Sequence, residues 1–128
     1  MTAFKTYRLR KEWVKLSSKN PRFYLMLINV FELFPTVPIV TNLWRSNAEQ
    51  IRIYRNNAKF VKKPWRSVHE LWRGCDVSIK NLTSEEIKAI VEAINEIYQY
   101  DKDRPTKKTA IHHDVGAGDH IHIQVNNS

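Results

Sequence analysis

The alternation of side chains over residues 120–125 constrains the fold of this chain more than any other feature. Isoleucine or valine occupies the odd positions, and His120, His122 and Gln124 occupy the even ones. Strict alternation of this kind predicts a β-strand with one apolar and one polar face. Because the polar face carries two imidazoles and an amide, it is either a solvated edge or half of a metal site.

The remaining elements predict an α+β fold. Valine- and isoleucine-rich runs at 37–43 and 74–79 predict short strands, and residues 109–115 and 120–125 predict a hairpin across "GAGD". Helices are predicted over residues 4–16, 21–34, 46–57 and 83–99. We therefore expect a small, mainly antiparallel sheet with helices packed on one face.

Two of these helices have clear start signals. Asn20 followed by Pro21 is typical of a helix N-terminus, and Thr83 with Glu86 fits a capping box. The helix over 21–34 is apolar on nearly all sides, so we expect it to be buried. The helix over 4–16 is expected to be anchored by Trp13, Val14 and Leu16.

Composition limits the class of protein. A length of 128 residues predicts one domain over residues 1–128. With one cysteine, Cys75, no intramolecular disulfide can form, and we expect this thiol in the core. The net charge of +8 favours an anionic partner: nucleic acid, an acidic membrane or a cell-wall polymer. The longest apolar stretch, 23–34, is too short to span a bilayer, and no signal peptide is recognisable.

Three residues could supply a catalytic metal site. Such a zinc site has three protein ligands and one open position for water. His69, Asp76 and His122 offer suitable nitrogen and oxygen atoms, and Asp119 offers a further carboxylate near the last of them. A carboxylate that is not a ligand can take a proton from the attacking water and return it to the leaving group. His112 and His113 are expected to be solvated or satisfied strand histidines, with a supporting role left open.

The spacing of these residues resembles a known family. "Ser67-x-His69" with "Gly74-x-Asp76" is similar to the Ser-x-His-x-x-Gly-x-Ala-x-Asp signature of the zinc D-alanyl-D-alanine carboxypeptidases and phage L-alanyl-D-glutamate endopeptidases. Asp119-x-x-His122 resembles the catalytic acid and third ligand of that family. "LWRSNAEQIRIY" (43–54) resembles its strand-to-helix stretch. One departure is Trp72, where the family has glycine.

The resemblance implies a hedgehog/DD-peptidase fold and a role for each matched residue. Zn²⁺ would be bound by His69, Asp76 and His122, and Asp119 would serve as general base and acid. Arg45 would steady the scissile carbonyl oxygen, and Ser67 and His120 would line the substrate cleft. The leading hypothesis is therefore a metallopeptidase that cuts the peptidoglycan stem peptide. A signal-free chain of this size fits a phage-encoded enzyme acting on the host cell wall.

Two alternatives remain open. A member of the same fold could bind the metal without catalysis and have a structural or wall-binding role. A nucleic-acid binder would use Trp44, Trp65 and Trp72 as stacking groups, but no RNA- or DNA-binding signature accompanies them, so no nucleic-acid partner is expected.

Overall fold

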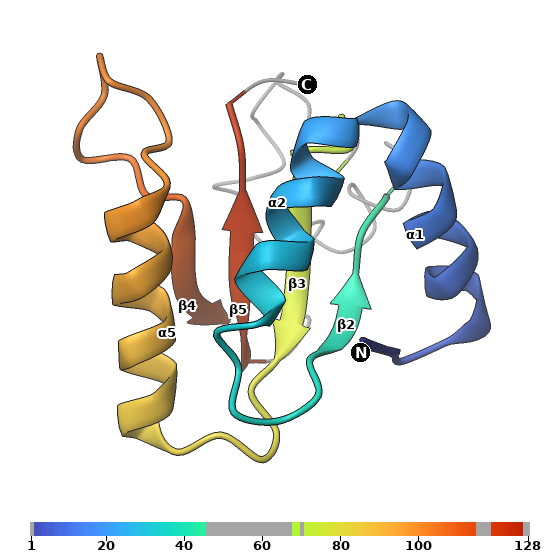
Figure 1. Ribbon diagram of the computed structural model, residues 1–128, viewed down its shortest axis with the longest axis horizontal. Helices are drawn as coiled ribbons and strands as arrows, with labels where there is room; N and C mark the ends of the chain where they lie inside the picture. Colours follow the sequence, from blue (N-terminus) through green and yellow to red (C-terminus); the bar gives the residue numbers. More distant parts are fainter. Residues whose placement is uncertain (1, 46–67, 70, 115–118, 127–128) are drawn as a thin grey trace, which may run out of the picture.

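A computed structural model describes residues 2–45, 68–69, 71–114 and 119–126. Within these residues a five-stranded sheet is accompanied by three helices (Figure 1). The strands are β1 (Ala3–Phe4), β2 (Ile39–Asn42), β3 (Gly74–Ser78), β4 (Ala110–Asp114) and β5 (Asp119–Gln124). The helices are α1 (Tyr7–Lys19), α2 (Pro21–Phe31) and α5 (Ser84–Ile97). The predicted α+β class is confirmed.

The sheet has the strand order β1-β2-β3-β5-β4 and is mainly antiparallel. Only the β1–β2 pair, among the described strands, is parallel. β4 and β5 pair with each other as the alternation of their residues predicts. Because β5 also pairs with β3, the C-terminal strand lies inside the sheet, next to a strand more than forty positions earlier in the chain. The predicted helix over 46–57 lies outside the described residues.

The helix starts follow from local chemistry. The Thr83 hydroxyl accepts from the Glu86 N–H at 3.1 Å, and the Glu86 carboxylate accepts from the Thr83 N–H at 2.8 Å, which confirms the capping box. The Asn20 side chain caps α2 by accepting from the Phe23 N–H at 3.2 Å. α1 begins at Tyr7, later than predicted, because Ala3 and Phe4 pair with β2.

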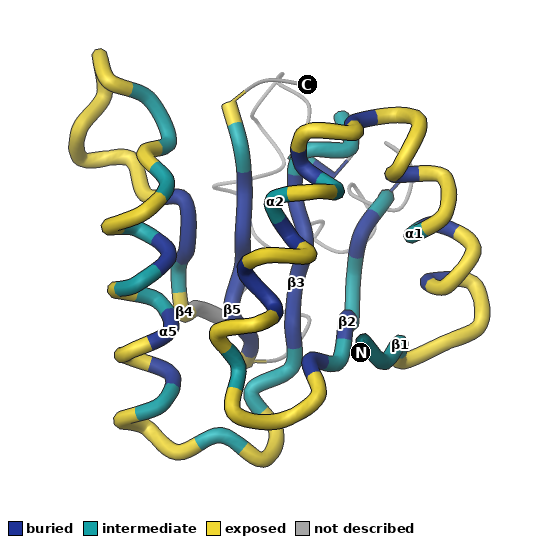
Figure 2. The backbone as a smooth tube through the Cα atoms, viewed as in Figure 1, coloured by how far each residue is buried: buried dark blue, intermediate teal, exposed yellow. Residues whose placement is uncertain are grey.

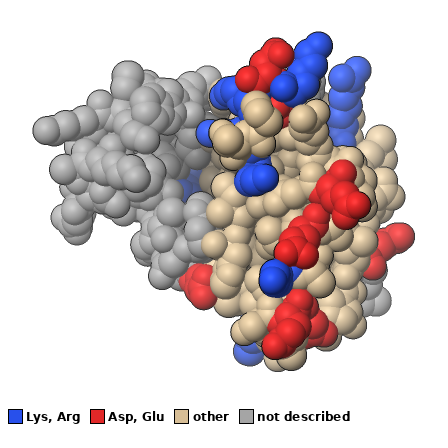
Figure 3. All heavy atoms as spheres, turned by 90° about the vertical axis from the view of Figure 1, so that its left-hand side faces the viewer, with Lys and Arg blue, Asp and Glu red and all other residues tan. Residues whose placement is uncertain are grey.

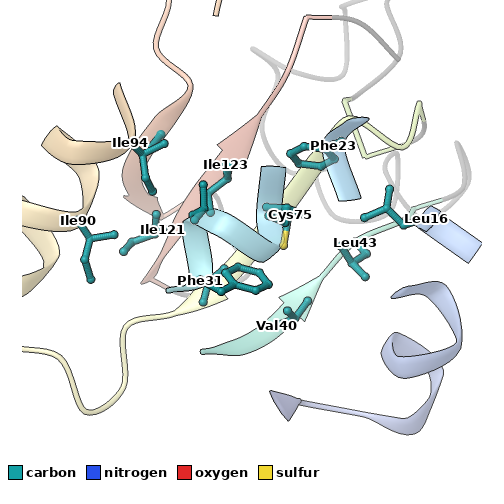
Figure 4. Packing of buried hydrophobic residues seen from close by; sticks show 14 of the residues in the cluster. Leu16, Phe23, Phe31, Val40, Leu43, Cys75, Ile90, Ile94, Ile121 and Ile123 are labelled. Atoms are coloured by element: carbon teal, nitrogen blue, oxygen red, sulfur yellow. The ribbon is translucent and has the colours of Figure 1, made fainter. Parts of the chain in front are cut away.

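One apolar cluster joins the helices to one face of the sheet. Figure 4 shows Phe23 and Phe31 of α2 and Ile90 and Ile94 of α5 gathered near the apolar side chains of the central strands. These strand residues are Val40, Cys75, Val77, Ile121 and Ile123, all completely buried. The expected placement of Cys75 in the core is confirmed, and burial, followed by the charge of Asp76, raises the pKa of its thiol well above the ordinary value.

Two burial predictions are wrong in part. Val14 is 66% exposed, because α1 packs through Leu9 and Leu16 on its other side. Leu25 in α2 is 60% exposed, since this helix lies over the sheet and is covered on one side (Figure 2). A helix that is apolar all round predicts full burial, but a single layer of helices over a sheet covers only one stripe of each.

Charge is unevenly distributed over the surface. Figure 3 shows acidic side chains running along the outer face of α5, and Lys and Arg gathered at one end of that view. The acidic residues of α5 are Glu85, Glu86, Glu92 and Glu96. An anionic partner would therefore meet repulsion at α5 despite the net charge of +8. No helix in the described part of the chain is long and apolar enough to cross a membrane.

Candidate metal centre

The alternation in β3 and β5 separates a polar face from the core. Asp76 and His122 are direct cross-strand partners, so their side chains lie on the same face of the sheet. His120, two positions before His122 and opposite Ser78, lies on that face too. The residues between them point the other way, into the apolar cluster. The period of two in the sequence thus places one carboxylate and two imidazoles together on a single surface.

His69 reaches this surface from the turn that precedes β3. The turn is held by the N–H groups of Leu71 and Arg73, which both donate to the Val68 carbonyl. Gly74 lets the turn come close to the strand: a Cβ there would lie 2.7 Å from Val68 Cγ2 and 3.3 Å from His69 Cε1. Gly74, which has no Cβ, therefore leaves room for Val68 and for the His69 ring beside the strand.

The three predicted ligands converge. One ligand atom from each of His69, Asp76 and His122 lies within 4.8 Å of the others, and all three side chains are buried. His69 Nε2 is 3.4 Å from Asp76 Oδ2, and His122 Nδ1 is 2.7 Å from Asp76 Oδ1. Two imidazoles and one carboxylate suit zinc and several other divalent ions. The group could therefore hold a metal ion.

Hydrogen bonds behind the ligands fix their orientation. His69 Nδ1 lies 2.9 Å from the Leu43 carbonyl oxygen, which can only accept, so Nδ1 carries the hydrogen and Nε2 turns toward Asp76. His122 Nε2 lies 3.1 Å from Gln124 Oε1. Support of this kind behind ligating histidines is usual in metal sites and strengthens binding.

The electrostatics favour a charged carboxylate beside neutral imidazole. Burial alone would raise the pKa of Asp76. The attraction of His69 when it is protonated at acid pH, together with hydrogen bonds from His122 and His69, outweighs burial and holds the pKa of Asp76 well below 3.8. Burial lowers the pKa of His69 from 6.5, although the charge of Asp76 opposes this shift. An ionised carboxylate and a neutral imidazole are the protonation states that bind a metal.

Two further side chains contact the carboxylate. The Arg45 guanidinium is buried and lies 3.5 Å from Asp76 Oδ2. The Asn42 amide donates to the same oxygen at 3.4 Å. Arg45 was a predicted site residue; Asn42 was not, although an amide closing the apolar run of β2 was a usable signal. Both lie at the end of β2 next to Asp76, and Asn42 is the register partner of that residue.

Asp119 is not part of this group. Its Oδ1 lies 2.9 Å from His112 Nε2, and its side chain is 54% exposed. Asp119 has the same parity in β5 as Ile121 and Ile123, and His112 is the cross-strand partner of Ile121. Asp119 and His112 therefore lie on the same side of the sheet as the apolar cluster, where β5 begins. Asp119 does not face His122. A separation of three residues along a regular strand places two side chains on opposite faces.

His120 lies close to the group instead. Its Nε2 is 3.4 Å from Asp76 Oδ1, and the side chain is buried. The sequence predicted that it lines the site, and the structure places it on the same face as the ligands. Ser67 lies outside the described residues, and so does the side chain of His113.

No protein-family model, curated protein or solved structure matches this chain.

Trp72 bears on the shape of the site. Its φ of 59° lies in the left-handed region that favours glycine, which gives a physical reason for a glycine at this point of a similar motif. The Trp72 ring stacks on Trp44 at 5.9 Å and 20° between planes. Since these two rings pack against each other, they are poorly placed as stacking platforms for nucleic acid.

Proposed function

We propose that this chain is a zinc-dependent peptidase with a hedgehog/DD-peptidase fold that hydrolyses a bond in the peptidoglycan stem peptide. The observation that carries the proposal is the convergence of His69, Asp76 and His122 within 4.8 Å, from segments far apart in sequence. These are the residues that the resemblance nominates as ligands. The resemblance also indicates the substrate class. The three matched segments, 43–54, 67–76 and 119–122, occur in the same order as in peptidases of the bacterial cell wall.

Zinc held by these three side chains would polarise the scissile carbonyl and activate a water molecule at neutral pH. The chain's own groups would do the rest. Asp76 and the two imidazoles hold the ion, and the buried carboxylate offsets its charge. Arg45, 3.5 Å from Asp76, has a fixed cationic fork that suits a developing negative charge on the carbonyl oxygen.

Two side chains, Asp119 and His120, are candidates for the group that transfers the proton. The sequence nominates Asp119, but its carboxylate pairs with His112 on the other side of the sheet. Geometry favours His120, which lies on the ligand face beside Asp76 and can take and return a proton as imidazole. We therefore infer that His120 carries the proton.

Muropeptide digestion tests the whole proposal. The zinc-loaded protein is incubated with purified muropeptides, and the masses of the products identify the bond that is cut. We expect His120→Ala to retain zinc and to lose at least a hundredfold in rate, and Asp119→Ala to retain most activity, since general acid–base groups contribute roughly 10²–10⁴-fold. A large loss in Asp119→Ala alone would restore the role that the sequence assigns to this residue.

Zinc binding is measured on the same proteins. His122→Ala should abolish stoichiometric zinc, because His122 belongs to the group. His113→Ala should leave it intact, as the sequence predicts for a strand histidine outside the ligand set. Equal zinc loss from both variants would mean that the centre has been assigned to the wrong residues.

A non-catalytic metal protein of the same fold is the second candidate. The observation that favours it is the position of Asp119, since the predicted acid does not face the ligands. Wild-type protein with full zinc that cleaves no wall preparation and no muropeptide would establish this alternative against the peptidase.

A further inference from the structure

We propose that Gln124 is a positioning residue that selects which nitrogen of His122 binds the metal. The inference rests on the metal centre proposed above. It concerns the hydrogen bonds behind His122, which are present in the chain itself and can be followed donor by donor.

The orientation of the Gln124 amide is fixed by a backbone group. Gln124 Nε2 lies 2.8 Å from the carbonyl oxygen of Lys108. A carbonyl oxygen can only accept, so the NH₂ end of the amide must face it. The opposite orientation would set two oxygens against each other. The acceptor end, Oε1, must therefore face His122.

The backbone keeps this arrangement in place. The Gln124 N–H donates to the Thr109 carbonyl at 2.8 Å, which holds the end of β5 against the residues that lead into β4. Gln124 lies two positions after His122, on the same face of the strand, and its side chain is buried. The amide thus sits directly behind the imidazole.

The tautomer of His122 follows. Gln124 Oε1 accepts at 3.1 Å from His122 Nε2, so that nitrogen must carry a hydrogen. The lone pair available to an ion is then on Nδ1, the atom 2.7 Å from Asp76 Oδ1.

The two histidines consequently use opposite ring atoms. The Leu43 carbonyl holds the hydrogen of His69 on Nδ1 and presents Nε2, whereas Gln124 holds that of His122 on Nε2 and presents Nδ1. Since the His69 hydrogen bond goes to the main chain, no substitution removes it directly. The His122 hydrogen bond goes to a side chain and can be tested.

The first measurement is direct. Long-range ¹H–¹⁵N correlation spectra of the zinc-loaded, ¹⁵N-labelled protein distinguish a ring nitrogen that binds metal from one that bears hydrogen. We expect His122 Nδ1 to be ligated and Nε2 to be protonated in the wild type. Ligation through Nε2 would overturn the inference.

The second measurement is zinc affinity by competition with a chelator. Gln124→Leu removes the acceptor and should weaken binding about 10–100-fold, the usual effect of losing support behind a ligand. Gln124→Glu keeps an acceptor opposite His122 Nε2 but sets its other oxygen against the Lys108 carbonyl, so it should recover part of the affinity that Gln124→Leu loses. A purely structural role would instead weaken zinc binding in both variants alike.

Asn95 provides a matched control. Its amide bonds both the N–H and the carbonyl of Ala110 in β4, away from the ligands. Asn95→Leu should lower stability and leave zinc affinity and the His122 spectrum unchanged. Unchanged affinity in Gln124→Leu would overturn the role of Gln124 and leave the metal centre intact, whereas absence of zinc from the wild type would overturn both.

Discussion

Gly74 is the residue whose size matters most for the candidate site. Gly74→Ala would place a methyl group 2.7 Å from Val68 Cγ2 and 3.3 Å from the His69 ring, so the turn that carries His69 must shift. We expect zinc affinity to fall about tenfold, because a displaced ligand binds less well. Chelator competition measures this loss.

Val77→Ala serves as the control for Gly74. Val77 lies in the same strand but faces the core, and its truncation should lower the free energy of unfolding without altering zinc affinity. If Gly74→Ala bound zinc as tightly as the wild type, the turn would be able to adjust without moving His69.

Trp72 permits a comparison of two small residues at one position. Trp72→Gly and Trp72→Ala both lose the stack on Trp44, but only glycine adopts a φ of 59° without strain. We expect the glycine variant to be the more stable by about 1 kcal/mol, in urea unfolding. Arg73 does not have a positive φ, so there the alanine variant should be more stable than the glycine variant. The reason is that glycine increases the conformational entropy of the unfolded chain. If Trp72→Ala were more stable than Trp72→Gly, the backbone at position 72 would not be strained by a side chain.

At the scale of elements, two helix caps differ in what they support. Asn20 caps α2 and also donates to the Trp72 carbonyl at 3.0 Å, so it ties the helix to the turn that carries His69. Thr83 caps α5, which packs on the opposite side of the sheet from the ligands. Each substitution by alanine should cost about 1 kcal/mol for the lost cap, and Asn20→Ala should cost more because the partly buried Trp72 carbonyl also loses its donor.

The two cap substitutions should differ in their effect on zinc affinity. We expect it to fall in Asn20→Ala and to remain unchanged in Thr83→Ala, measured in parallel with urea unfolding. Equal affinities would show that α2 does not help to hold the ligand turn.

At the scale of the whole molecule, the buried site predicts acid sensitivity. The pKa of His69 in the folded chain is lowered from 6.5. Below pH 6.5 the unfolded chain therefore binds a proton at His69 that the folded chain does not bind. The free energy of unfolding falls as the pH drops toward the pKa of the folded state. The pKa of Asp76 is held well below 3.8, so its contribution is complete above pH 3.8 and is lost as the pH falls through its folded value.

Urea unfolding with chelator present tests this prediction between pH 7.5 and 4.5. The free energy of unfolding should decline below about pH 6.5, and His69→Gln should flatten this part of the curve. Wild-type stability that is constant or rises on acidification would show that His69 is not buried as a neutral group.

Features set within a few residues were predictable. The capping box of α5, the cap of α2 and the alternation in β5 depend on neighbours in the chain, and the structure confirms all three. The candidate ligands His69, Asp76 and His122 could be named because they match the spacing of a motif, and the structure brings them together. Val14 and Leu25 were misjudged, since no local pattern says which side of a helix a sheet will cover.

By itself, then, the sequence determined the class of fold, the two faces of β5 and the three residues that form the candidate metal site, because each depends on short-range periodicity or on spacing. Tertiary structure decided which polar groups meet across the sheet. Pairing of β5 with β3 brings His120 beside Asp76, and pairing with β4 joins Asp119 to His112 and brings Gln124 to the Lys108 carbonyl. The physical reason is that strand register, which packing of the apolar face selects, fixes every contact on the polar face as well.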